Sequence, residues 1–149
     1  MDDLSPEVLD RVRSMCEALP EVQEQMAWVG VRWRVRHHTF AHLLVVADGK
    51  PQGHARTAGT DGPVTMLTFR APASEVEAYA SMGAPYFYAG WGRDVVGLVL
   101  DDDTDWDEVE ELVTDSYREL APKKLVDRLD QGARPMSQPP RAEKPSKTM

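Results

Sequence analysis

Three arginines stand at alternate positions in one short stretch, Arg32, Arg34 and Arg36, with Trp33 and Val35 between them. Successive side chains of a β-strand point to opposite faces, so we expect the arginines on one face and the apolar residues on the other. A row of cations on one face could bind anions such as nucleic-acid phosphates. The alternative is a solvated face whose charges prevent pairing with another strand.

Other cations could extend an anion-binding surface, although charge is distributed unevenly along the chain. The candidates are Lys50, Arg56, Arg93, Lys123 and Lys124. Six basic residues and two acids fall between positions 32 and 70, whereas ten acids and one base fall between 101 and 119. The net charge of −8 argues against indiscriminate DNA binding, because sequence-independent affinity comes from cations that neutralise phosphates.

One aromatic residue, Trp91, lies between Gly90 and Gly92 in a predicted turn, directly before Gly92 and Arg93. The indole would be either a core residue or an exposed anchor for an interface or a stacked base. In the second case Arg93 would supply a positive charge beside the indole, and the two residues would form a second wing of the anion-binding surface.

No residue pattern indicates catalysis or a bound metal. The glycines at positions 90, 92 and 97 are not followed by the Lys-Ser/Thr pair and helix that a phosphate-binding loop requires. The four histidines lack the helical spacing or cysteine partners of a zinc site. Ser116 falls within a predicted helix, away from any strand–turn–helix elbow. We therefore expect no catalytic residue, no metal and no cofactor.

Composition indicates one domain followed by a tail. A chain of 149 residues with 42% hydrophobic residues is long enough for a core of its own. Neither a signal peptide nor a run of about 20 apolar residues is present, so we expect a cytoplasmic protein without a membrane span. We place the domain at residues 1–129. Residues 130–149 are rich in proline and poor in apolar residues, which predicts a disordered tail.

The order of the predicted elements defines the fold class. Ser5-Pro6-Glu7 begins a helix whose apolar stripe includes Cys16, which we expect to be a buried and inert thiol. A first strand is expected near Met26–Val29, and a turn at His37-His38 would join the arginine strand to the next strand. Short hairpin connections exclude parallel crossovers. The fold should be an α+β two-layer sandwich, with a mainly antiparallel sheet and helices packed on one face.

The remaining elements follow from the spacing of apolar residues and from the residues that mark turns. After the hairpin turn, Phe40, His42, Leu44 and Val46 should continue the buried face. Residues 47–63 are expected to form a long loop. Strands are predicted at 64–69 and 95–100, a helix between them, a helix after Asp105 and a short helix after Pro122. Asp103, Thr104 and Asp105 occupy positions where they could cap the helix that follows.

The second half of the chain resembles the MmcQ/YjbR family. The residues that carry this resemblance are Pro85-Tyr86-Phe87, Gly90-Trp91, Leu98-Val99-Leu100-Asp101, Asp105-Trp106-Asp107-Glu108 and Ser116 to Leu125, with a second patch from Trp33 to Leu43. The family usually has Gly-Lys at the central hairpin turn, where this chain has His37-His38. The resemblance covers roughly the first 129 residues. It implies a small α+β domain proposed to bind DNA, and it brings no catalytic residues.

The resemblance and the charges together lead to two functional hypotheses. The first is a non-enzymatic DNA-binding protein that contacts phosphates through the arginine hairpin. The alternative is a protein-interaction module or homodimer with a charged docking face, because opposite charges on one small domain favour docking. The family's fold has also been likened to that of frataxin, which suggests a weak cation-binding ridge at Asp101–Glu111; helix capping is the simpler interpretation of these acids.

Overall fold

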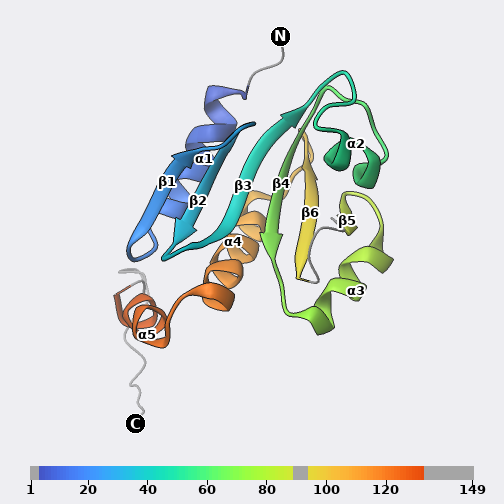
Figure 1. The fold of residues 1–149 in the computed structure, drawn as a ribbon. Helices are drawn as coiled ribbons and strands as arrows, with labels where there is room; N and C mark the ends of the chain where they lie inside the picture. The colour runs from blue at the N-terminus through green and yellow to red at the C-terminus, as the bar shows by residue number, and fades with distance from the viewer. Residues whose placement is uncertain (1–3, 89–93, 133–149) are drawn as a thin grey trace.

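A six-stranded antiparallel sheet forms the centre of the protein (Figure 1). The computed structural model describes residues 4–88 and 94–132. The strands lie in the order β1-β2-β3-β4-β6-β5, and every pair is antiparallel. Their bounds are β1 Val22–Met26, β2 Val31–Val35, β3 His38–Val46, β4 Val64–Arg70, β5 Tyr86–Tyr88 and β6 Val95–Leu100. The predicted α+β class with an antiparallel sheet is confirmed.

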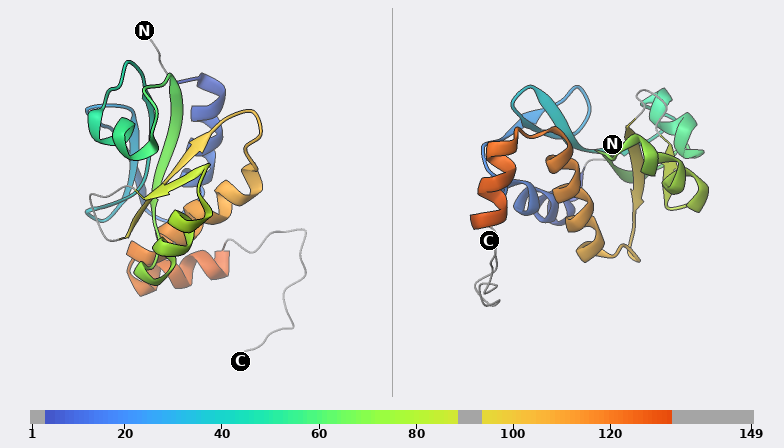
Figure 2. Two further views of the ribbon diagram at one scale, coloured as in Figure 1. Left: turned by 90° about the vertical axis from the view of Figure 1, so that its right-hand side faces the viewer. Right: turned by 90° about the horizontal axis from the view of Figure 1, so that it is seen from below.

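Helices lie on both sides of the sheet, but unequally. Their bounds are α1 Pro6–Glu17, α2 Gln52–Ala58, α3 Ala73–Met82, α4 Trp106–Leu120 and α5 Lys123–Gly132. Helices α1, α4 and α5 pack behind the sheet as drawn in Figure 1, while α2 lies in front of it (Figure 2). Because α2 covers only the end of the front face, the described residues leave much of that face uncovered (Figure 2); we call it the open face. None of the described helices is long and apolar enough to cross a membrane.

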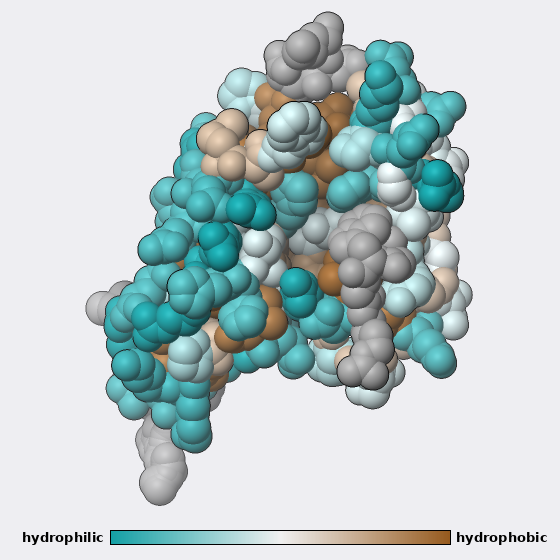
Figure 3. All heavy atoms as spheres, in the orientation of Figure 1, coloured by the Kyte–Doolittle hydropathy of each residue, from teal (hydrophilic) through white to brown (hydrophobic). Residues whose placement is uncertain are grey.

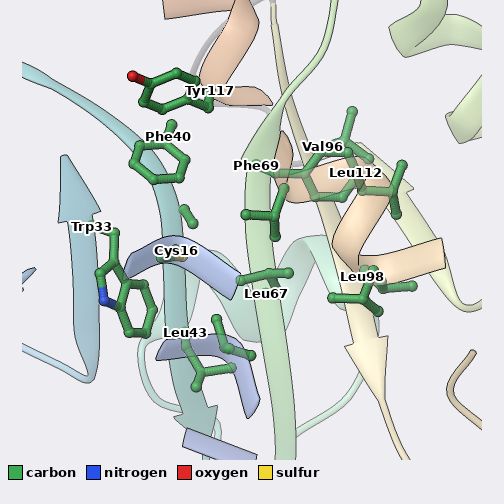
Figure 4. Close-up of a cluster of buried hydrophobic side chains, with 14 of the residues drawn as sticks. Cys16, Trp33, Phe40, Leu43, Leu67, Phe69, Val96, Leu98, Leu112 and Tyr117 are labelled. Atoms are coloured by element: carbon green, nitrogen blue, oxygen red, sulfur yellow. The ribbon is translucent and has the colours of Figure 1, made fainter. Parts of the chain in front are cut away.

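The main core lies between the sheet and the helices behind it. Phe40 and Tyr117 meet there edge to face, with ring centroids 5.5 Å apart (Figure 4). The Tyr117 hydroxyl donates to the Pro20 carbonyl at 2.7 Å, so the buried ring leaves no polar atom unpaired. Cys16 is completely buried in this core, as predicted, and burial raises the pKa of its thiol. A thiol that stays protonated and inaccessible is inert.

Helix capping explains the boundaries of α1 and α4. Ser5 accepts a hydrogen bond from the Val8 amide at 3.4 Å, and Pro6 occupies the first turn of α1. Asp105 accepts from the amides of Asp107 and Glu108 at 3.1 and 3.2 Å and so caps α4. These bonds satisfy amides that a helix start leaves unpaired. The capping interpretation of the acids before α4 therefore holds for Asp105.

A β-bulge in β3 changes which residues face the helices. Trp33 pairs with Ala41 and Arg34 pairs with Thr39, so Phe40 is an extra residue without a partner in β2. Two consecutive side chains, Phe40 and Ala41, are consequently buried in the main core. An extra residue of this kind shifts the alternation of all residues that follow it.

The bulge overturns one prediction about β3. We expected Phe40, His42, Leu44 and Val46 to share one buried face, but only Phe40 faces the helices behind the sheet. Leu44 and Val46 pack with Ala55 of α2 in a small cluster on the open face, and His42 lies in register with Arg32. The physical reason is the unpaired residue, which moves the later positions to the opposite face.

Three other boundaries differ from expectation. The predicted loop at residues 47–63 contains α2, whose Ala55 packs on β3 and β4. The first strand is β1, four residues before the position that we predicted at Met26–Val29. Helix α5 extends to Gly132, so Asp130 is helical and forms a 2.6 Å ion pair with Arg118. The rest of the predicted tail, residues 133–149, lies outside the described residues.

Candidate nucleic-acid interface

The middle of the open face carries a row of residues from neighbouring strands. The antiparallel registers place Arg32 of β2 opposite His42 of β3, His42 opposite Thr68 of β4, and Thr68 opposite Gly97 of β6. Phe87 of β5 completes the row, since a side chain at Gly97 would overlap its ring. Gly97 is therefore explained by the packing of Phe87 on the strand.

A groove of about 380 Å³ lies on the open face beside this row. Arg32, Arg70 and Asp94 contribute its charged groups, and His42 and Thr68 also line it. Figure 3 views the molecule from this side, where hydrophilic residues predominate over the strands β1 and β2. Two guanidinium groups and a hydroxyl around one hollow are suited to binding an anion.

Both groove arginines are held by a neighbouring side chain. Arg32 donates through Nε to Oε1 of Gln25 at 2.8 Å, which leaves its terminal nitrogens without a hydrogen bond to the described residues. Arg70 donates to Oδ2 of Asp94 at 3.0 Å, with the two side chains 30% and 39% exposed. Asp94 therefore offsets one positive charge, and the groove keeps a net charge of one from these three groups.

His42 is a neutral polar group in the groove. Its Nε2 lies 2.7 Å from the Val29 carbonyl oxygen, and because a carbonyl only accepts, Nε2 carries the proton. Nδ1 is then an acceptor when the ring is neutral. Burial lowers the pKa of His42; the bond to the Val29 carbonyl raises it by a smaller amount, and the charge of Arg32 has the least effect and lowers it. His54 of α2 stands against it with ring centroids 6.0 Å apart.

The two histidines predict how stability depends on pH. Burial also lowers the pKa of His54, so both rings bind protons less readily in the folded protein than in the unfolded chain. The contribution of these histidines to the free energy of unfolding should be fully present above the pKa of histidine in the unfolded chain, about 6.5. It should be lost as the pH falls below that value. Melting temperatures measured between about pH 7.5 and 5 test this. His42→Gln should flatten the curve, whereas His38→Gln, at an exposed position, should retain it.

The predicted arginine stripe is only partly realised. Arg34 lies on β2 and donates to the His37 carbonyl at 2.9 Å, while its Nε is buried without a partner among the described residues. Arg36 follows the strand with a φ of 56° and forms a 2.9 Å ion pair with Glu21. Its place in the turn is the reason that Arg36 leaves the face, because the left-handed conformation ends the strand alternation. Only Arg32 of the three lines the groove.

The other predicted cations lie on several elements. Lys50 is exposed beside Trp28, and Arg56 is exposed on α2 near Asp48 and Asp61. Lys123 and Lys124 begin α5, which packs behind the sheet, so the structure does not bring them to the open face. Lys123 pairs with Asp127 at 3.2 Å. Trp91 and Arg93, the predicted second wing, lie outside the described residues.

Sequence patterns did not reveal Arg70, Asp94 and Trp28 as candidate site residues. Arg70 ends β4 as a single charge after an apolar strand, and only the sheet register brings it near Arg32. Trp28 lies in the turn between β1 and β2 and is 101% exposed. Gly30, with a φ of 79°, ends this turn and was the available signal for a tight hairpin there.

A second, mostly apolar pocket of about 610 Å³ opens between β6 and the start of α4. Its rim carries Asp101, Asp103 and Asp105, and the Tyr86 hydroxyl donates to Glu108 within it. Burial and this carboxylate raise the pKa of Tyr86. The acidic rim repels phosphates, so this pocket is unsuited to binding them.

Comparison with known proteins agrees with this architecture. A structure from Pseudomonas syringae shares 12% identity and a TM-score of 0.56, over 78% of this chain and 98% of that chain. A DUF419-domain protein from Deinococcus radiodurans shares 18% identity and a TM-score of 0.55, over 82% of this chain and 87% of that chain. At these identities the likeness concerns the fold. A search of curated proteins gives no significant match.

The fold defines the chain as a small α+β domain in which an antiparallel sheet has helices packed behind it. The YjbR family model matches residues 17–119, which is more than half of the chain. The chain belongs to the YjbR family.

Proposed function

We propose that the protein binds DNA, with phosphate groups held in the groove of the open face. The observation that carries the proposal is the pair of arginines, Arg32 and Arg70, that two separate strands bring to one hollow. Arginine binds phosphate oxygens through two parallel hydrogen bonds, and Arg32 has terminal donors available for them. Thr68 and the neutral His42 add polar contacts of the kind that position a nucleic-acid backbone.

The distribution of charge favours DNA binding at the groove over binding spread across a wide basic surface. The exposed acids of α4 lie behind the sheet, away from the groove. With few cations at the interface, binding should have a shallow salt dependence, with a slope of log affinity against log salt of about −2. Fluorescence anisotropy of labelled DNA in a salt series measures this slope. No binding at micromolar protein in about 50 mM salt would refute the proposal.

Asp94 provides a test in which affinity should increase. Its carboxylate occupies Arg70 and repels phosphate, so Asp94→Asn should raise DNA affinity by roughly two- to fivefold at low salt. A misfolded variant would not bind more tightly, so a gain is informative. Asp102→Asn changes the net charge equally at an exposed position before α4 and should leave the affinity nearly unchanged. Equal gains in both variants would show that only total charge matters.

The alternative, a charged protein-interaction module, is favoured by a different surface. Helix α4 exposes Asp107, Glu110, Glu111, Asp115 and Glu119 on the side away from the groove. A basic partner, or the groove of a second copy, would complement this face. Sedimentation at two protein concentrations and two salt concentrations tests it: a monomer under all conditions rules out the homodimer.

A further inference from the structure

We infer that the nucleic acid bound at the groove is single-stranded, with a base stacked on Trp28; this inference rests on the proposed function. The Trp28 side chain is 101% exposed, although a tryptophan normally buries most of its large apolar surface. Exposed aromatic rings beside cations are the feature with which proteins bind unpaired strands. The position of Trp28 relative to the groove carries the inference.

The turn that presents Trp28 is well anchored. The Ala27 amide donates to the Gly30 carbonyl at 3.0 Å, and His42 donates to the Val29 carbonyl at 2.7 Å. Gly30 lies so close to the backbone of β3 that a side chain there would overlap the Leu43 carbonyl oxygen. The indole is thus exposed on a fixed backbone, which reduces the ordering cost when a base stacks on it.

Cations line the hollow at Trp28 and the groove at its sequence neighbour Ala27. Ala27, its neighbour in sequence, lines the groove together with Arg32 and Arg70. Trp28 itself shares a shallow surface pocket of about 450 Å³ with Lys50, two residues before α2. A strand could therefore place one phosphate in the groove, a base on Trp28 and the next phosphate near Lys50.

A duplex fits this arrangement poorly for two reasons. In a duplex the bases are stacked on one another, so Trp28 could reach a base face only after unpairing, which costs a few kcal/mol. Duplex binding also depends on neutralising many phosphates, whereas the groove offers Arg32 and Arg70 with Asp94 already paired to one of them. An unpaired strand provides accessible base faces and needs fewer cations.

The test compares two probes with the full-length protein. A labelled oligodeoxythymidine of about ten nucleotides and a labelled hairpin duplex are titrated in about 50 mM salt. We expect the single strand to bind more tightly. Trp28→Ala should weaken single-strand binding by roughly five- to a hundredfold and leave the weaker duplex binding unchanged. Trp28→Phe keeps an aromatic face and should retain most of the affinity.

Matched controls make the outcomes distinct. Met26→Ala removes a nearby apolar side chain, 75% exposed but without an aromatic face, and should bind as the wild type does. Tighter binding of the duplex would overturn the inference while the proposed function stands. If the wild-type protein bound neither probe, both the inference and the proposed function would be refuted. Dissociation of an oligomer by Trp28→Ala, seen by sedimentation, would assign the indole to a protein interface and overturn the inference.

Discussion

Replacing Arg32 and Arg70 together by glutamine should lower the affinity for DNA by roughly a hundredfold or more, because each lost charge-assisted hydrogen bond costs about 1.5–3 kcal/mol. Each single variant should lose roughly tenfold. Stability should change little, since the ion pair of Arg70 with Asp94 is partly exposed and such pairs contribute less than about 1 kcal/mol. Anisotropy titration and thermal melting of the same samples measure both quantities.

A second double variant separates the groove from total charge. Arg36→Gln with Arg128→Gln removes the same two charges, but both of these residues pair with Glu21 away from the groove. This variant should keep an affinity close to that of the wild type. If it weakened DNA binding as much as the groove variant, binding would depend on net charge and the groove would not be the interface. Retained binding by Arg32→Gln/Arg70→Gln would also show that the groove is not the interface.

Replacing Ser116 by alanine should lower the free energy of unfolding by about 1–3 kcal/mol, with a melting temperature several degrees lower. The Ser116 hydroxyl is fully buried between α4 and the sheet. It accepts from the Arg70 amide at 2.7 Å and donates to the Phe40 carbonyl at 2.6 Å. Alanine would leave the buried Phe40 carbonyl and the part-buried Arg70 amide without this partner, which costs more than the mere loss of a contact.

An exposed serine provides the control for this variant. Ser81→Ala, on α3, makes the same chemical change in contact with solvent and should shift stability by less than about 0.5 kcal/mol. Urea unfolding of the two variants gives the comparison. An effect of Ser116→Ala as small as that of Ser81→Ala would show that the bridge to the sheet contributes nothing.

The bridge made by Ser116 also connects stability to the site. Phe40 is the extra residue of the bulge, and Arg70 is the last residue of β4, so one hydroxyl joins the two backbone groups where the strand ladder is interrupted. The bulge in turn places His42 beside Arg32 on the open face. A residue of the helix layer therefore supports the geometry of a groove on the opposite side of the sheet.

Local patterns in the sequence determined much of the fold. Alternation predicted that Trp33 and Val35 are buried while Arg32 and Arg34 lie on the other face, and the structure agrees. Capping residues marked the starts of α1 and α4 at Ser5 and Asp105. These predictions are correct because each depends on residues only a few positions apart, whose side chains are related by backbone geometry alone.

Only the tertiary structure decided which residues meet at the candidate site. Arg36 is lost from the stripe because its left-handed conformation in the turn directs it to Glu21. Arg70 joins Arg32 because three strands pair in one register, and His42 changes face because the bulge at Phe40 adds a residue. Packing between distant segments sets the strand register and the positions of bulges. The alternation of apolar and polar residues along a single strand does not reveal that packing.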